Sequence, residues 1–299
     1  MLFNVLSSHP DLWSLYRESQ AIFDQHFPVK MITGSSEVVR ASNINQGNSE
    51  AIERSFYDSV GNMGSAHMAL SKGTSRLLRS RVGGTLLKVP VVSSFRLSSV
   101  YTRFGQGRKS PPLRIIEKTP ENCFRIEALD RIFPDSQFIY LVRDPRQAIA
   151  SIYSGWRDGL QFRRCEFPPD FNVRGYEGRS WCFGLIPQWE RLNNSELIDV
   201  CAHQWLSYHD YCQQDLPSNP ARVIQVRYEE LASNPGRTLR QIAEWAELDW
   251  GPLSLFEAEL PIVNTLTRPG AEKWRRIETE IEKITDLIRA AATGLGYSV

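Results

Sequence analysis

Residues 137–156 read QFIYLVRDPRQAIASIYSGW. The first six of them, 137–142, form a nearly continuous apolar run, which is typical of a buried parallel strand. Pro145 then lies near the start of a segment with helical character that continues through Trp156, because proline is favoured in the first turn of a helix. A strand that leads directly into a helix indicates an α/β protein.

The residues just before this stretch extend the same pattern. LRIIEK (113–118) is rich in residues that favour strands, and residues 120–133 carry apolar side chains at helical spacing. Strand, helix, strand and helix therefore follow one another over 113–156. This order is a βαβ unit, so we expect an α/β fold built on a parallel sheet.

The rest of the chain shows further elements around this unit. We expect helices over 2–27 with a break at Pro10, and over 50–81, 205–216, 234–248 and 275–295. We expect strands at 83–92 and 222–228, a polar loop at 33–49, and a long irregular segment at 157–187 that is typical of a lid or a binding loop. We find no repeat and no linker, so we expect a single domain over residues 1–299.

The composition narrows the class of protein. Of 299 residues, 41% are hydrophobic and 23% are charged, and no apolar run is long enough to span a membrane. The net charge is +1, which argues against a general nucleic-acid binder and means that any anion site must be local. Five irregularly spaced cysteines favour free thiols in a reducing compartment, so we expect a cytoplasmic protein.

The most informative polar residues follow the strand 137–142. Arg143 lies at its carboxyl end, where open α/β sheets bind ligands. Ser151 lies about two turns along the next helix, on the same face. A guanidinium fork with a nearby hydroxyl suits a phosphate group. The alternative is a surface pair between Arg143 and Asp144 with Ser151 merely exposed, and the pattern alone does not decide between them.

Two more residues stand at predicted strand ends. Lys118 ends the strand 113–118, and across the βαβ unit we expect it to share one crevice with Arg143; the alternative is a solvated lysine. Tyr228 ends the strand 222–228. It could contact a purine, or it could pack the junction between strand and helix.

These segments together resemble the sulfotransferase family, which uses 3′-phosphoadenosine 5′-phosphosulfate as the sulfuryl donor. The block from Glu117 to Trp156 is similar to that family's region, and RDPR with Ser151 resembles its 3′-phosphate motif. VRYEEL and the tail EKWRR…LGY resemble later family elements. The tail and HPD resemble the branch of tyrosylprotein sulfotransferases and many bacterial enzymes. The resemblance implies a P-loop-NTPase-like parallel sheet flanked by helices.

The resemblance also implies roles for residues in donor binding. Arg143 and Ser151 would hold the 3′-phosphate, and Tyr228 would help to fix the adenosine. Lys273, in EKW, matches a donor-binding lysine of the family, and Thr265 is a looser candidate.

For catalysis, the resemblance assigns Lys118 to the oxygens around the moving sulfuryl group. Glu18 is the implied base for a hydroxyl or amine acceptor, with a simple helix carboxylate paired to Arg17 or Lys30 as the alternative, and His9 is a weaker candidate. The family needs no metal. The acceptor would be a small molecule or a peptide.

Four tryptophans could line an acceptor pocket, although aromatic residues at helical positions are more often core residues. They are Trp156, Trp181, Trp189 and Trp205.

The first residues carry a separate expectation. In the family, the segment that resembles LFNVLSSHPDL (2–12) is a helix that follows a strand and a Gly-rich phosphate-binding loop. Met1 stands about where that loop should join the helix. The resemblance therefore predicts that this chain begins after the first strand and loop, and that it could be inactive. A nucleotide kinase-like phosphotransferase and an inactive nucleotide-binding homologue remain the alternative functions.

Overall fold

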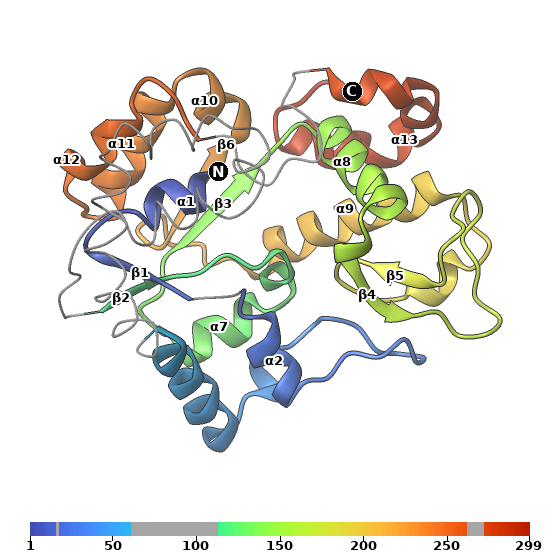
Figure 1. The fold of residues 1–299 in the computed structure, drawn as a ribbon, viewed down its shortest axis with the longest axis horizontal. Helices are drawn as coiled ribbons and strands as arrows, with labels where there is room; N and C mark the ends of the chain where they lie inside the picture. The colour runs from blue at the N-terminus through green and yellow to red at the C-terminus, as the bar shows by residue number, and fades with distance from the viewer. Residues whose placement is uncertain (16–17, 61–112, 262–271) are drawn as a thin grey trace, which may run out of the picture. The chain divides into compact units, whose positions relative to one another are not determined.

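The computed structural model describes residues 1–15, 18–60, 113–261 and 272–299. The chain divides into two compact units, whose elements are labelled in Figure 1. Unit 1 is formed from Met1–Ile22, Glu50–Thr119 and Glu230–Pro269, and unit 2 from Phe23–Ser49, Pro120–Glu229 and Gly270–Val299. A single domain over 1–299 stays a prediction, since one domain can contain two compact units.

Unit 1 contains a short parallel strand pair. β1 (Leu12–Ser14) pairs with β2 (Arg114–Ile116), so that Leu12 lies opposite Arg114 and Ser14 opposite Ile116. β2 confirms the predicted strand at 113–118. The helix predicted from Trp13 onward is wrong at β1, because three residues are too few to show a strand period and the partner strand is distant in sequence. The helices of this unit include α1 (Leu2–Leu6), α11 (Pro235–Trp245) and α12 (Trp250–Leu253), followed by the 3₁₀ turn η5 (Ser254–Phe256).

Unit 2 contains the strand and helix of the decisive stretch. β3 (Phe138–Val142) pairs in parallel with β6 (Val223–Arg227), and Val142 lies opposite Arg227 at the end of the pair. α8 (Pro145–Asp158) follows β3 directly. Asp144 caps α8, because its Oδ1 accepts a hydrogen bond of 2.9 Å from the backbone nitrogen of Arg146, and Pro145 occupies the first turn as predicted.

The remaining helices agree with the sequence pattern in position and differ in detail. The helix predicted over 120–133 is a 3₁₀ turn, η2 (Pro120–Phe124), followed by α7 (Ile126–Ile132). α9 (Leu197–Asp215) begins earlier than the helix predicted over 205–216. Residues 46–60 are helical, so a helix begins inside the predicted loop, and residues 61–81 and 83–92 lie outside the described residues. The other helical elements are α2 (Gln20–His26), η1 (Ala41–Asn43), α9 (Leu197–Asp215), α10 (Tyr228–Ser233), η6 (Lys273–Ile277) and α13 (Glu278–Gly294).

The segment 157–187 is more regular than its sequence indicates. β4 (Arg163–Glu166) and β5 (Ser180–Cys182) form an antiparallel pair, with Arg163 opposite Cys182 and Glu166 opposite Ser180. The 3₁₀ turns η3 (Leu160–Phe162) and η4 (Trp189–Leu192) lie before and after this pair in the chain.

The core of unit 2 contains the four tryptophans. Trp181 has 0% exposure and Trp205, the most exposed of the four, has 8%. The rings of Trp156 and Trp181 meet edge to face at 5.3 Å, and the indole nitrogen of Trp156 donates to the buried Gln204 Oε1 at 2.7 Å. These side chains are therefore core residues rather than the walls of an open acceptor pocket.

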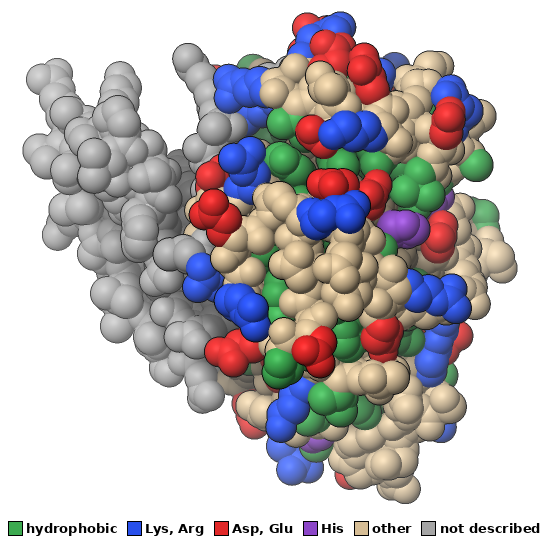
Figure 2. Space-filling model, turned by 90° about the vertical axis from the view of Figure 1, so that its right-hand side faces the viewer, with side chains coloured by type: hydrophobic (Ala, Val, Ile, Leu, Met, Phe, Trp, Pro, Cys, Tyr) green, Lys and Arg blue, Asp and Glu red, His purple; other side chains and the backbone are tan. Residues whose placement is uncertain are grey.

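The described residues confirm the α/β class, with parallel strand pairs and helices. All five cysteines are free thiols, as expected. On the face drawn in Figure 2, Lys and Arg side chains lie among Asp and Glu side chains. This mixture agrees with the net charge of +1.

Candidate functional site

The register of β3 and β6 brings two predicted site residues together. Arg143 follows Val142 at the end of β3, and Tyr228 follows Arg227 at the end of β6. The guanidinium carbon of Arg143 lies 4.6 Å from the centre of the Tyr228 ring, which is the distance of a cation–π contact. The carboxyl ends of these parallel strands therefore carry a cation and an aromatic face side by side.

Ser151 completes this group, as predicted. Arg143 Nη1 lies 3.4 Å from Ser151 Oγ, and the Ser151 hydroxyl donates to the Gln147 carbonyl at 2.9 Å, one turn back on α8. The Arg143 Nε atom is buried and has no hydrogen-bond partner within the described residues. A guanidinium with a donor still to be satisfied and a hydroxyl beside it is suited to an anion.

The alternative pairing of Arg143 with Asp144 is not what the structure shows. Asp144 pairs with Arg146 instead, through contacts of 2.7 Å to Nη2 and 3.1 Å to Nε. The carboxylate nearest in sequence is thus occupied by another arginine, and Arg143 forms no ion pair with a carboxylate in the part of the chain that the structure describes.

Lys273, at the start of η6, adds positive charge to the same group. Burial, and then the charges of Arg143 and Arg276, lower the pKa of the Lys273 ammonium. Trp274 beside it stacks with Arg146 at 4.8 Å and with Arg275 at 4.9 Å. Cations that raise one another's energy are stabilised by an anion between them, so this arrangement is compatible with the predicted local anion site, which stays a prediction.

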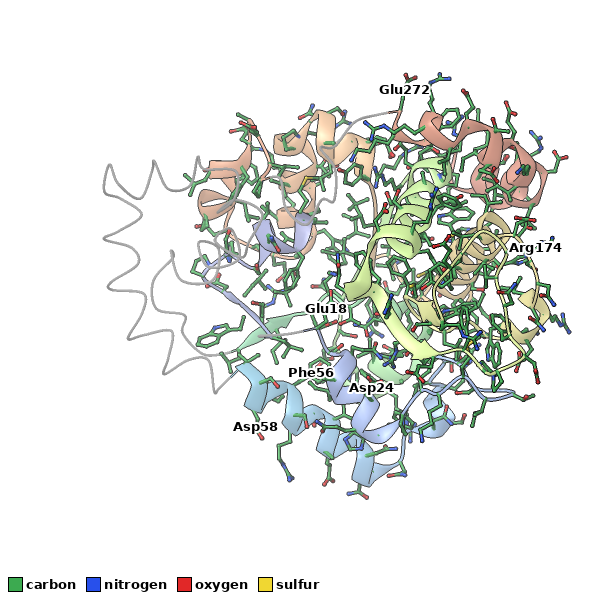
Figure 3. The ribbon with its side chains drawn as sticks, turned by 45° about the vertical axis from the view of Figure 1, so that its right-hand side comes forward. Glu18, Asp24, Phe56, Asp58, Arg174 and Glu272 are labelled. Carbon is green, nitrogen blue, oxygen red and sulfur yellow. The ribbon has the colours of Figure 1, made fainter. Side chains whose placement is uncertain are left out.

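A second predicted pair lies within unit 1. Lys118, two residues after β2, forms an ion pair with Glu18, whose side chain is labelled in Figure 3. The two side chains are 48% and 50% exposed, so both can be reached by a ligand. The predicted alternative partner Arg17 lies outside the described residues.

Buried hydrogen bonds support the backbone on both sides of this pair. The backbone nitrogen of Ser19 donates to Thr119 Oγ1 at 2.8 Å and to Glu117 Oε1 at 3.0 Å. Ser19 has 0% and Thr119 5% exposure. The residues next to Glu18 and Lys118 are therefore fixed, although the two charged groups themselves face solvent.

The remaining predictions concern Thr265, a crevice shared by Lys118 and Arg143, and His9. Thr265 lies outside the described residues, so its role stays a prediction. Lys118 and Arg143 belong to different units, and a shared crevice also stays a prediction. His9 is fully buried, with Nε2 at 2.9 Å from the Asp249 carbonyl and Nδ1 accepting from the Asp11 nitrogen at 3.1 Å, which is a structural role.

Arg143, Tyr228, Ser151 and Lys273 are called the Arg143 group below. Three residues next to this group were not predicted from the sequence. Glu229 accepts from the backbone nitrogen of Asp144 at 3.0 Å and from the Tyr297 hydroxyl at 2.7 Å. Arg276 adds charge next to Lys273. The signal for Glu229 was its place directly after Tyr228, whereas nothing local marks Tyr297 as a neighbour.

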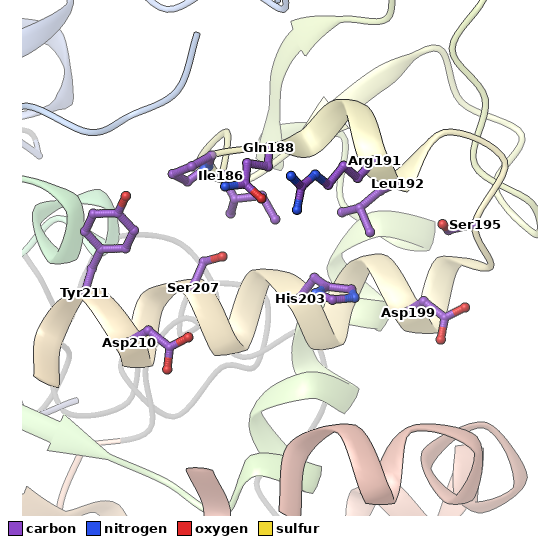
Figure 4. A pocket seen from close by; sticks show the side chains of 11 residues that line it. Ile186, Gln188, Arg191, Leu192, Ser195, Asp199, His203, Ser207, Asp210 and Tyr211 are labelled. Atoms are coloured by element: carbon purple, nitrogen blue, oxygen red, sulfur yellow. The ribbon is translucent and has the colours of Figure 1, made fainter. Parts of the chain in front are cut away.

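Unit 2 also has an open groove along α9, shown in Figure 4. Its volume is about 550 Å³, and acidic, basic and hydroxyl side chains line it together. The lining residues are Ile186, Pro187, Gln188, Arg191, Leu192, Ser195, Asp199, His203, Ser207, Asp210 and Tyr211. This groove does not include the residues predicted for donor binding.

No group of three or more His, Cys, Asp or Glu side chains in the described ranges is placed to hold a metal ion. No helix in the same ranges is both long and apolar enough to cross a membrane.

Comparison with known families decides the class of protein. The model of the sulfotransferase family matches residues 1–201 and 180–252. The chain belongs to the sulfotransferase family. Assignment of this sulfotransferase-family chain to the tyrosylprotein branch stays a prediction.

One curated relative of this sulfotransferase-family chain shows low sequence identity. A protein of Aquifex aeolicus (strain VF5), described as uncharacterized, is 20% identical over 186 residues, which are 59% of this chain and 21% of that protein. The chain thus spans about a fifth of the length of that curated relative.

Two solved structures are similar over nearly the whole chain. The sulfotransferase domain from the curacin biosynthetic pathway has 13% identity and a TM-score of 0.40, covering 96% of this chain and 97% of that one. Sulfotransferase STF9 from Mycobacterium avium has 15% identity and a TM-score of 0.41, covering 97% of this chain and 72% of that one. The family assignment rests on the family model.

Proposed function

We propose that this chain transfers a sulfuryl group from 3′-phosphoadenosine 5′-phosphosulfate to a hydroxyl or amine on a small molecule or a peptide. Family membership supports sulfuryl transfer in general. The observation that carries the choice of donor is the Arg143 group. Its buried Nε atom has no partner within the described residues, and Ser151 and the ring of Tyr228 lie beside it.

These residues fit the nucleotide end of the donor. Arg143 presents parallel N–H groups that match two oxygens of a 3′-phosphate. The Ser151 hydroxyl can rotate from the Gln147 carbonyl to a third oxygen, because a hydroxyl hydrogen turns freely about its C–O bond. Tyr228 offers an aromatic face to the adenine, and Lys273 adds charge to the same group.

The donor supplies an activated sulfuryl group, whose bond to the 5′-phosphate breaks as the acceptor attacks. We propose that Lys118 stabilises the negative charge that builds on the phosphate oxygen, and that Glu18 takes the proton of the acceptor. Lys118 has three N–H groups, so it can keep Glu18 as a partner while it donates to a ligand. The five free thiols fit the cytoplasm as the compartment.

A transfer assay tests this proposal. The chain is incubated with a mixture of hydroxyl and amine acceptors and either a radiolabelled sulfuryl donor or a nucleoside triphosphate labelled in its terminal phosphate. We expect label to move only from the sulfuryl donor. Lys118→Ala should lower the rate, whereas Lys283→Ala, which removes an exposed lysine paired with Glu280, should not.

Two other results would replace the proposal. Transfer only from the triphosphate would make the chain a kinase-like phosphotransferase. Binding of adenosine 3′,5′-bisphosphate without transfer from either donor would make it an inactive nucleotide-binding homologue.

A further inference from the structure

Glu229 joins the two strand ends that carry the Arg143 group. Its Oε1 accepts the backbone N–H of Asp144 at 3.0 Å, and that nitrogen belongs to the peptide unit that directly follows Arg143. Glu229 itself directly follows Tyr228, whose ring contacts Arg143. One carboxylate thus fixes the backbone next to both residues that are proposed to bind the nucleotide.

The second oxygen of Glu229 is held by the end of the chain. Tyr297, which is 8% exposed, donates its hydroxyl to Glu229 Oε2 at 2.7 Å. Burial, followed by this hydrogen bond and the charge of Glu229, raises the pKa of Tyr297, so the hydroxyl keeps its proton and remains a donor. A carboxylate with two donors is restrained in both position and orientation.

Tyr297 is placed by a turn with specific requirements. Gly296 has a φ of +77°, a conformation that favours glycine, and the Tyr297 backbone nitrogen closes the end of α13 on the Ala292 carbonyl at 2.9 Å. Arg227, the last residue of β6, stacks on the Tyr297 ring at 4.2 Å and reaches the Gly296 carbonyl at 3.4 Å. The turn after α13 is therefore docked onto the end of β6.

We propose that Glu229 and Tyr297 are positioning residues for the 3′-phosphate site. They hold the Arg143–Asp144 peptide against the end of β6, so that the Arg143 guanidinium meets a phosphate without first losing conformational freedom. This inference rests on the proposed function, because it assumes that Arg143 binds the 3′-phosphate. It adds two residues that do not contact the ligand and act through the strand ends.

The test measures the dissociation constants of adenosine 3′,5′-bisphosphate and 5′-AMP by calorimetry. The dissociation constant of 5′-AMP divided by that of the bisphosphate is the ratio that reports the contribution of the 3′-phosphate. Tyr297→Phe keeps the ring on Arg227 and removes only the hydroxyl. We expect the ratio to fall about three- to tenfold, which is less than the roughly 10- to 150-fold of a direct hydrogen bond to a charged group because Tyr297 acts on Arg143 indirectly, with little change for AMP. Tyr176→Phe is the control, since it removes a hydroxyl that contacts Cys182 Sγ at 3.6 Å elsewhere in unit 2, and it should leave the ratio unchanged.

Glu229 variants separate positioning from simple stability. Glu229→Gln can still accept from Asp144 and donate to Tyr297, so its ratio should stay within about twofold of the wild type. Glu229→Ala should lose at least as much as Tyr297→Phe. The double variant Glu229→Ala/Tyr297→Phe should lose no more than Glu229→Ala alone, because the tyrosine acts through the carboxylate.

The outcomes distinguish this inference from the proposed function. If the wild type does not prefer the bisphosphate, the donor assignment fails and this inference fails with it. If the wild type prefers the bisphosphate and Arg143→Ala abolishes that preference, but Tyr297→Phe lowers only the melting temperature, the inference alone is overturned. Additive losses in the double variant would also overturn it.

Discussion

Lys118 and Glu18 form an ion pair whose members are about half exposed. An exposed pair contributes about 0–1 kcal/mol to the free energy of unfolding, so removing either charge should barely change stability. Loss of activity in such a variant would then report chemistry rather than folding. This property makes the pair a good place to test catalytic roles at the scale of single residues.

Lys118→Ala should lower kcat more than it weakens donor binding. The ammonium matters most when negative charge builds on the departing phosphate oxygen, which happens in the transition state. Initial rates over a range of donor concentrations give kcat and KM for the variant and for the Lys283→Ala control. A raised KM with an unchanged kcat would show that Lys118 only binds the donor.

Glu18→Gln should remove the acid limb of the pH–rate profile. The amide cannot accept a proton, so the rate loses the dependence on a carboxylate that must be ionised to act as a base. The profile is measured at saturating donor, with Glu280→Gln as the control at a glutamate that is 33% exposed and paired with Lys283. A near-normal rate and profile in Glu18→Gln would rule this residue out as the base.

At the scale of elements, α8 packs closely against two aromatic rings. A Cβ atom at Gly155 would lie 2.4 Å from Phe183 Cζ and 3.2 Å from Phe162 Cδ2. The rings of Phe162 and Phe183 are stacked at 4.7 Å, so neither can move without breaking the other contact. The close approach of α8 therefore depends on glycine at this position.

Gly155→Ala should destabilise the protein by up to about 2 kcal/mol, because overpacking costs about 1–3 kcal/mol and the gain in helix propensity offsets only about 1 kcal/mol of it. Gly294→Ala is the matched control in α13, since no atom lies within 4 Å of its Cβ position. Urea unfolding of both variants measures the difference. A Gly155→Ala variant as stable as Gly294→Ala would contradict the packing of α8 described above.

The helices and strands also show which parts of the fold could be predicted from the sequence. The apolar run 137–142 and the signals Asp144 and Pro145 were sufficient to predict β3 and α8, because both depend on local rules. The strand-end position of Arg143 and the spacing to Ser151 followed from them. β1 could not be predicted, since its strand form depends on pairing with β2, a segment far away in the sequence. Tyr297 was missed for the same reason, because its contact with Glu229 joins distant parts of the chain.

At the scale of the whole molecule, unit 2 contains a network of buried ion pairs in addition to its apolar core. Arg125 is 1% and Glu37 0% exposed, and the two form an ion pair. Arg164 Nε also donates to Glu37 Oε1 at 2.7 Å, and Arg164 Nη1 donates to Asp24 Oδ2 at 2.9 Å. The guanidinium of Arg125 lies 4.6 Å from the Phe23 ring centre. Segments that are far apart in the sequence are thus joined through one charged network.

Arg125→Met should destabilise the protein by about 3–5 kcal/mol, because it leaves Glu37 buried with one partner fewer. Arg174→Met is the control, since Arg174 and Glu196 form a pair in which the side chains are 59% and 47% exposed, and its loss should cost less than about 1 kcal/mol. Thermal unfolding followed by circular dichroism compares the two variants. Equal melting temperatures would contradict a structural role for the buried network.

The central claim is that Arg143 holds the 3′-phosphate of the nucleotide, and titration calorimetry tests it most directly. Adenosine 3′,5′-bisphosphate and 5′-AMP are titrated into the wild type and Arg143→Ala. A charge-assisted hydrogen bond contributes about 1.5–3 kcal/mol, so the variant should bind the bisphosphate about 10- to 150-fold more weakly while its affinity for AMP changes little. Equal losses for the two ligands, or an unchanged affinity for the bisphosphate, would contradict the assignment of Arg143 to the 3′-phosphate.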